Sequence, residues 1–354
     1  MSKKILSIVG ARPQFIKLSA LSNKIQVKFK EIIVHTGQHY DQNMSDIFFE
    51  ELGISKPDYN LGIGSGGHGA QTGAMMNKLE EVFEKELPDL VFIFGDTNST
   101  LAGALVASKI GIKIVHIEAG LRSFNRAMPE EINRVVADHV SDYLYAPNND
   151  ALNNLTKEGI AAKTIVTGDI MVDSVLENAK KAEKRTHMLD ELNIKGDEFY
   201  LATLHRPYNV DDPNNLKLIF REFSNLNNPI IFPIHPRTKK VINENNIKVP
   251  ESVKLIKPMG YIDFICLQQH CKKIITDSGG IQKEAYILKK PCITLRSETE
   301  WTETVASGWN LLININKNPS FSSLIESFSP PMKHKPLFGE NVADKMLTHI
   351  QQII

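Results

Sequence analysis

Short runs of β-branched and other apolar residues alternate along this chain with longer segments that have helical periodicity. In the first half the apolar runs lie at residues 5–9, 31–35, 90–94, 113–117, 143–146 and 164–167. After a polar stretch at 177–197 the rhythm returns, with runs at 199–203, 229–234, 253–256, 273–276 and 292–295. This alternation is typical of parallel sheets with helices on both faces. The sequence therefore predicts an α/β protein with two doubly wound domains.

The boundary between the two domains is predicted close to residue 170, because Thr167-Gly168-Asp169 closes the last strand of the first half. This gives a first domain at 1–170 and a second at 171–340, and 354 residues suffice for two domains of ordinary size. The final segment, 341–354, follows the Pro330-Pro331 break and predicts an amphipathic helix.

Composition narrows the functional classes. The chain is 42% hydrophobic and 23% charged with a formal net charge of zero, so no overall basic field favours nucleic acid or a membrane surface. No apolar run approaches the roughly 18 residues that cross a bilayer, and we expect a cytoplasmic protein. Cys266, Cys271 and Cys292 lack CxxC spacing, which predicts buried free thiols and neither disulfides nor a Cys-based zinc site.

Polar residues that directly follow the apolar runs are the candidates for chemistry, because ligands of open α/β sheets lie beyond the carboxyl ends of the strands. After the first run, the segment Gly-Ala-Arg-Pro-Gln-Phe-Ile-Lys at 10–17 places Arg12 and Lys17 near the start of a helix. A helix N-terminus and a guanidinium both suit phosphate. An ordinary turn with surface charges is the alternative.

Three acids follow strands or the loops after them. Asp96 lies at the tip of the run that ends at residue 94, Glu118 directly follows the run at 113–117, and Glu130 belongs to Met-Pro-Glu-Glu-Ile-Asn-Arg at 128–134. Carboxylates that share one crevice can have their pKa values pushed apart to serve as acid and base. Two structural roles stay open: Asp96 as a helix N-cap, and ion pairs of these acids with Arg122, Arg126 and Arg134.

In the second half the strongest local signal is Thr-Asp-Ser-Gly-Gly-Ile-Gln-Lys-Glu at 276–284. Two glycines that open a helix after a strand offer backbone N–H groups to a phosphate, and Glu284 one turn later could accept ribose hydroxyls. His205 at another strand tip is either a hydrogen-bonded structural residue or a catalyst. The GxGxxG match at 62–67 has no apolar strand before it, so it predicts a mobile loop near the ligand and no dinucleotide site.

Together these stretches resemble the non-hydrolysing UDP-N-acetylglucosamine 2-epimerase family from Gly10 to about Asn310. The motifs that carry the resemblance are Gly10-Ala-Arg-Pro-Gln-Phe-Ile-Lys17, Thr36-Gly-Gln-His39, Gly95-Asp-Thr97, Glu118-Ala-Gly-Leu-Arg122, Pro129-Glu-Glu-Ile-Asn-Arg134, His205-Arg206 and Thr276-Asp-Ser-Gly-Gly-Ile-Gln282. The resemblance implies two Rossmann-like domains of GT-B-like architecture, a ligand cleft between them, and the helix at 341–354 packing back on the first. It also implies a UDP-sugar as ligand, no cofactor or metal, and a homodimer as the assembly that the family suggests.

The implied reaction inverts carbon 2 of the sugar by eliminating UDP to a 2-acetamidoglucal and adding UDP back, for surface polysaccharide biosynthesis. The proton on carbon 2 has no adjacent carbonyl, so its removal must accompany departure of the diphosphate, which needs cations and carboxylates. By motif match the catalytic residues are Asp96, Glu118, Glu130 and His205, and the UDP-binding residues are Arg12, Lys17, Phe264, Ser278, Gly279, Gly280 and Glu284.

The chain also departs from the family pattern. It reads Glu300-Trp301-Thr302-Glu303 where many members carry an Arg-Pro pair, so that an aromatic replaces a cation near the nucleotide, and Pro207-Tyr208 where many carry Arg-Glu. The segments 37–44 and 295–301 look more like a sub-branch that acts on UDP-2,3-diacetamido-2,3-dideoxyglucuronate, which is the alternative substrate. A hydrolysing relative, a glycosyltransferase and a noncatalytic sensor are the remaining alternatives.

Overall fold

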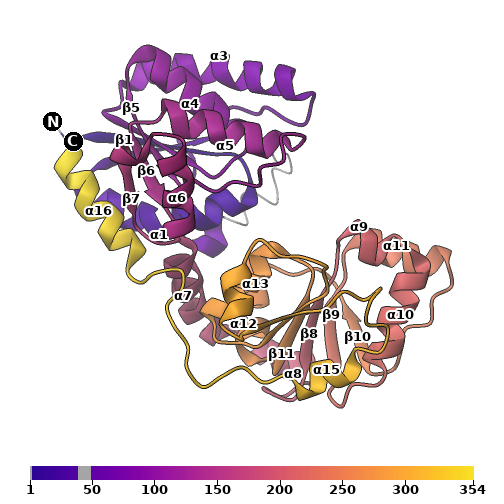
Figure 1. Cartoon of the computed structure of the whole chain (residues 1–354). Helices are drawn as coiled ribbons and strands as arrows, with labels where there is room; N and C mark the ends of the chain where they lie inside the picture. The colour runs from indigo at the N-terminus through magenta and orange to yellow at the C-terminus, as the bar shows by residue number, and fades with distance from the viewer. Residues whose placement is uncertain (1, 39–48) are drawn as a thin grey trace. The chain divides into compact units, whose positions relative to one another are not determined.

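A computed structural model describes residues 2–38 and 49–354, which form two compact units (Figure 1). The first unit comprises Met1–Ser174 and Phe338–Ile354, and the second comprises Val175–Leu337. His39 of the Thr36 motif and residues 40–44 of the sub-branch signature lie outside the described residues.

The first unit is built on a seven-stranded parallel sheet in the order β3-β2-β1-β4-β5-β6-β7. Its strands are β1 Lys4–Val9, β2 Lys30–His35, β3 Tyr59–Asn60, β4 Leu90–Phe94, β5 Lys113–Ile117, β6 Tyr143–Ala146 and β7 Thr164–Val166. Every residue of the central strand β4 is buried, because helices cover both faces of a parallel sheet and leave no polar side. The carboxyl ends of β1, β4 and β5 therefore meet at one edge, where the chain carries its acids.

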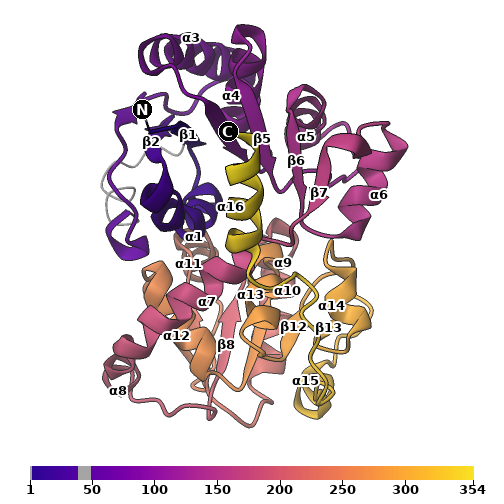
Figure 2. The same ribbon diagram turned by 90° about the vertical axis from the view of Figure 1, so that its left-hand side faces the viewer.

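The helices of the first unit form two layers. The layer of α3 His68–Glu86, α4 Asn98–Ile110 and α5 Pro129–Val140 packs side by side (Figure 1). Helix α1 Arg12–Lys28 packs with the C-terminal helix α16 Val342–Ile353, as Figure 2 shows. An ion pair links the two helices, with 2.6 Å between Lys24 Nζ of α1 and Asp344 Oδ1 of α16. Further helices here are α6 Asn149–Lys157, the 3-10 turn Ala161–Lys163, and α7 Met171–Ala182, which continues into the second unit.

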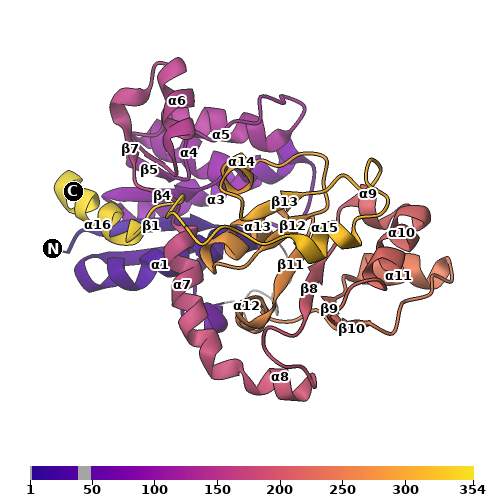
Figure 3. The same ribbon diagram turned by 60° about the horizontal axis from the view of Figure 1, so that its bottom comes forward.

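The second unit has a six-stranded parallel sheet in the order β10-β9-β8-β11-β12-β13. Its strands are β8 Tyr200–Thr203, β9 Ile230–Pro233, β10 Val253–Ile256, β11 Lys273–Thr276, β12 Cys292–Thr294 and β13 Asn310–Leu312. Its helices are the 3-10 turn Glu183–Arg185, α8 His187–Glu191, α9 Pro207–Val210, α10 Pro213–Phe223, α11 Pro236–Glu244, α12 Tyr261–His270, α13 Gly279–Ile287, α14 Thr302–Ala306 and α15 Ser322–Ser327. Helices α10 and α11 lie side by side (Figure 3).

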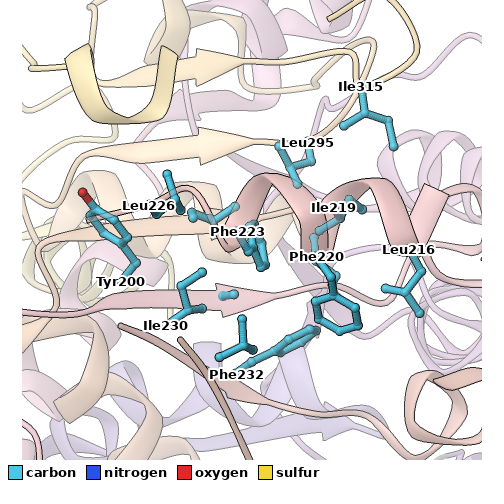
Figure 4. Packing of buried hydrophobic residues seen from close by; sticks show 14 of the residues in the cluster. Tyr200, Leu216, Ile219, Phe220, Phe223, Leu226, Ile230, Phe232, Leu295 and Ile315 are labelled. Carbon is cyan, nitrogen blue, oxygen red and sulfur yellow. The ribbon is translucent and has the colours of Figure 1, made fainter. Parts of the chain in front are cut away.

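Alternation along the strands of the second unit divides its core between the two faces of the sheet. Tyr200 and Ala202 of β8 join a cluster with α10 and α15, whereas Leu201 between them packs in a separate cluster with α8, α12 and α13. Figure 4 shows the first cluster, where Phe220 and Phe223 of α10 lie beside Ile230 and Phe232 of β9. Full burial of each such side chain stabilises the fold by about 1.5–3 kcal/mol.

The structure confirms the prediction of an α/β protein with two parallel sheets, and a strand lies at each of the eleven predicted runs. The sequence interpretation missed β3 and β13, which are short strands at the sheet edges. Strand β3 ends two residues before Gly62, but it consists of Tyr59 and Asn60 and is not apolar, so the prediction that no apolar strand precedes the glycines at 62–67 agrees with the structure. Cys266, Cys271 and Cys292 are free and buried, as predicted. No helix among the described residues is both long and apolar enough to span a bilayer.

Candidate functional site

Gln14 in the first turn of α1 holds two strand-end loops together. Its Oε1 accepts the N–H groups of Gly10 at 2.8 Å and Ala11 at 3.1 Å, and its Nε2 donates to the carbonyl of Phe94 at 2.8 Å. A Cβ on Gly10 would collide with the hydroxyls of Thr36 and Ser99, so only glycine fits here. The turn after β1 is therefore fixed against the end of β4.

Lys17, from the second turn of α1, forms an ion pair with Glu118 at the end of β5. Both side chains are largely buried, Lys17 with 8% and Glu118 with 13% of its side chain exposed. Glu118 has φ +70°, a conformation that costs a non-glycine residue about 1–3 kcal/mol and occurs preferentially at functional sites. The fold thus holds the Glu118 carboxylate in a strained position beside a buried cation.

Asp96 follows β4 and forms an ion pair with Arg134 of α5. The N-cap of α4 is Thr97, whose side chain accepts the N–H of Thr100, so Asp96 does not have the capping role that the sequence left open. Asn133 donates to the backbone carbonyl of Asp96 at 2.9 Å and holds the same loop from α5. The ion-pair alternative is therefore correct for Asp96 and Arg134.

Arg134 also bonds Glu131, at 2.9 Å. Glu131 accepts three more hydrogen bonds, from the N–H and hydroxyl of Ser123 and the N–H of Phe124. Burial alone would raise the pKa of the Glu131 carboxyl, but these bonds and the charge of Arg134 hold that pKa below its usual range. Glu130, the neighbouring predicted catalytic acid, is exposed in the first turn of α5.

A fully buried network lies behind these loops. His116 of β5 bonds Asp138 of α5 through Nδ1 at 2.7 Å and the carbonyl of Gly95 through Nε2 at 2.7 Å. Asp138 also accepts the N–H of Gly120 at 3.1 Å and pairs with Arg122 at 2.7 Å. Burial would raise the pKa of Asp138, and the charges of His116 and Arg122 lower it instead. The sequence interpretation missed His116 and Asp138, although a histidine inside an apolar strand was a signal.

In the second unit, Asp277 after β11 organises the loop after β8. Its buried carboxylate accepts the N–H groups of His205 at 3.1 Å and Arg206 at 3.0 Å, and the amide of Asn209 at 2.9 Å. The His205 ring lies 3.3 Å from the same carboxylate. Burial lowers the pKa of His205, Asp277 opposes this, and the charges of Arg206 and His235 add to it. Asp277 belongs to the motif at 276–284, but the sequence interpretation did not predict it as a site residue.

The predicted phosphate loop has the expected local structure. Ser278 is the N-cap of α13, and Gly279 and Gly280 are its first two residues. Glu284 lies one turn later and is buried, where its carboxylate accepts bonds from Tyr261 at 3.2 Å and Gln268 at 2.7 Å. Of the other predicted UDP-binding residues, Arg12 is exposed at the start of α1, and Phe264 of α12 is partly buried against the α8–α12–α13 cluster.

Trp301, which stands where many members of the resembled family carry arginine, packs against a cation. The Nζ of Lys283 lies 4.2 Å from the centre of its ring. Such a contact stabilises by about 0.5–2 kcal/mol. A positive charge is therefore retained near this departure from the family pattern, supplied by α13.

Two parallel sheets, with ion-paired acids beyond the carboxyl ends of β4 and β5, define the α/β class of protein that binds ligands at this edge of a sheet. A family model described as UDP-N-acetylglucosamine 2-epimerase matches residues 22–349. The chain therefore belongs to the UDP-N-acetylglucosamine 2-epimerase family, whose members are isomerases.

Three relatives illustrate the similarity. A Methanococcus maripaludis protein named UDP-N-acetylglucosamine 2-epimerase homolog is 53% identical over 343 residues, which cover 95% of this chain and 96% of the relative. The UDP-2,3-diacetamido-2,3-dideoxy-D-glucuronate 2-epimerase of Pseudomonas aeruginosa is 51% identical over 318 residues, or 88% of each chain. The crystal structure of Methanocaldococcus jannaschii UDP-GlcNAc 2-epimerase in complex with UDP-GlcNAc and UDP has a TM-score of 0.85 and 46% identity over 99% of both chains.

Proposed function

We propose that this chain is a non-hydrolysing UDP-sugar 2-epimerase that inverts carbon 2 through elimination and re-addition of UDP via a 2-acetamidoglucal. The observation that carries the proposal is the pairing of Glu118 with Lys17 and of Asp96 with Arg134 at adjacent strand ends. Loss of the carbon 2 proton together with the diphosphate requires carboxylates and cations of this kind.

The acids of the first unit have different environments, which supports different roles. Glu118 is largely buried beside Lys17, whereas Glu130 is exposed. We assign these two residues to proton transfer on the two faces of the sugar. Asp96, which Arg134 holds in place, adjusts the electrostatic environment of Glu118 and Glu130.

The second unit would hold the nucleotide. Ser278, Gly279 and Gly280 at the start of α13 suit the diphosphate, and Glu284 suits the ribose hydroxyls. His205 acts near the diphosphate, where its lowered pKa keeps the ring neutral near pH 7. Arg12, Lys17 and Phe264 complete the proposed UDP-binding set, and no cofactor takes part.

UDP-N-acetylglucosamine is the main candidate substrate, because the names of relatives at 53% and 46% identity refer to it. UDP-2,3-diacetamido-2,3-dideoxyglucuronate is the second candidate, supported by the 51% identical Pseudomonas aeruginosa relative and by Glu300-Trp301 in this chain. Both products would feed surface polysaccharide biosynthesis in the cytoplasm, and we expect a homodimer.

The test is to incubate the protein with each UDP-sugar separately and to identify the products by NMR. The proposal predicts the carbon 2 epimer of one sugar with the UDP linkage intact. Accumulation of free sugar and UDP would indicate a hydrolysing enzyme, and transfer only after addition of an acceptor would indicate a glycosyltransferase. Binding without any change of either sugar would indicate a sensor.

A further inference from the structure

The carboxylate of Glu300 lies against the N-terminus of α13. A Cβ built on Gly279 would collide with Glu300 Oε1, so the carboxylate occupies the space next to the first residue of the helix. Glu300 Oε2 accepts a hydrogen bond from Arg296 Nη1 at 2.8 Å. An anion is stabilised at a helix N-terminus by the helix dipole and by N–H groups without intrahelical acceptors.

The loop that carries Glu300 is fixed independently of this ion pair. Leu295, immediately before Arg296, is buried in the core of the second unit. Thr299 donates to Gln282 of α13 at 2.6 Å, and Asn310 of β13 donates to the same amide oxygen at 3.0 Å. Breaking the Arg296–Glu300 pair would therefore leave the loop attached to α13.

Arg296 lies among other charged groups of the proposed diphosphate site. Burial raises the pKa of the Tyr208 hydroxyl, Arg296 and Arg206 lower it, and Asp277 and Glu300 raise it further. Arg206 is itself held at the start of α9 by the buried Asp277. Both guanidinium charges therefore act on Tyr208, and that of Arg296 is paired with Glu300.

We infer that Glu300 competes with the substrate diphosphate for the N-terminus of α13, and that Arg296 becomes a diphosphate-binding residue when the nucleotide displaces Glu300. The inference rests on the proposed function, because it takes the diphosphate site at Ser278–Gly280 from there. A nucleoside diphosphate carries more negative charge than one carboxylate, so it can take both the helix N-terminus and Arg296 from Glu300. Glu300 thereby lowers the affinity for the nucleotide and favours its release.

Two substitutions on the same ion pair should act in opposite directions. Glu300→Gln should tighten UDP binding by about twofold to fivefold, the range that an anion at a helix N-terminus contributes. Arg296→Gln should weaken UDP binding on the order of tenfold, as expected for loss of a charged hydrogen bond. If the pair served only to hold the loop, both substitutions would change the affinity in the same direction.

Isothermal titration of the full chain with UDP measures both effects, and Glu298→Gln, which removes an exposed acid two residues earlier, is the matched control. Thermal melting verifies folding, and Arg296→Lys, which keeps the charge, replaces Arg296→Gln if that variant unfolds. Binding of uridine, which has no phosphate, should be unaffected by Glu300→Gln. Equal or weaker UDP binding by Glu300→Gln, or a parallel gain for uridine, would overturn the inference alone. Failure of the unmutated chain to bind UDP would overturn the proposed function as well.

Discussion

Replacement of Arg134 by methionine tests the arrangement of the acids most sharply among single substitutions. Arg134 is the only described side chain that pairs with both Asp96 and Glu131, so its loss frees the Asp96 carboxylate while Asn133 still holds the Asp96 backbone and the apolar stem is kept. Asp96, with 33% of its side chain exposed, can then turn toward water. We expect kcat to fall on the order of a hundredfold, the lower range for acid–base groups, with little change in KM.

The cost in stability follows from the same contacts. A hydrogen bond to a charged group contributes about 1.5–3 kcal/mol, but Asp96 is partly exposed and Glu131 keeps its bonds from Ser123 and Phe124. The expected destabilisation is therefore about 2 kcal/mol, or a fall in Tm of about 4–8 °C for a domain of this size. Arg134→Lys keeps the charge but cannot bridge both acids. Its Tm should therefore lie between those of the unmodified chain and Arg134→Met.

The assay combines steady-state epimerisation with thermal melting. Lys3→Met is the control, because Lys3 forms an exposed ion pair with Asp89 in the same unit and should change Tm little and kcat not at all. A folded Arg134→Met protein with normal kcat would refute the view that Arg134 positions Asp96.

Three further predictions concern other residues. Glu118→Gln and Glu130→Gln should each lower turnover by about 10²–10⁴ while UDP affinity by titration stays within a few fold; near-normal turnover would remove that residue from the mechanism. Asp138→Asn removes the charge between fully buried His116 and Arg122 and should cost about 3–5 kcal/mol in urea denaturation, against less than about 1 kcal/mol if the network is unimportant. Burial raises the pKa of Glu31 despite hydrogen bonds from neighbouring side chains, so its charged form costs stability above the unfolded pKa. Glu31→Gln should therefore raise Tm at pH 8, with a gain that shrinks as pH falls toward the ordinary carboxyl pKa of about 4.5, and a gain that grows as pH falls would contradict the assignment.

The parallel sheets were predictable because both the apolar runs of the strands and the helical periodicity between them are visible in the local sequence. Edge strands such as β3 have too few residues to give such a pattern. The positions of Asp96 and Glu118 at strand ends were predictable for the same reason. Their partners were not, because Lys17 lies 101 residues from Glu118 in the chain and only the packing of α1 against β1 and β2 brings Lys17 to the sheet edge where Glu118 lies. Whether Asp96 capped a helix or paired with arginine also depended on three-dimensional structure, since Thr97 next to it can cap a helix too.

In the second unit, the position of Glu300 likewise could not be predicted from the sequence. The sequence placed a phosphate-type loop at Ser278 to Gly280 and noted that Glu300 begins a departure from the family pattern. That the Glu300 carboxylate lies against Gly279 depends on how the loop after β12 folds over α13. Side-chain competition for a helix N-terminus cannot be read from spacing.

The central claim is that carbon 2 of a UDP-linked sugar loses and regains its proton. The most direct measurement is the reaction in deuterated water with UDP-N-acetylglucosamine and, separately, the diacetamido-uronate, followed by NMR. The account predicts deuterium at carbon 2 in the epimerised sugar of one substrate, with UDP still attached. Epimerisation that retains the original hydrogen at carbon 2 would contradict it.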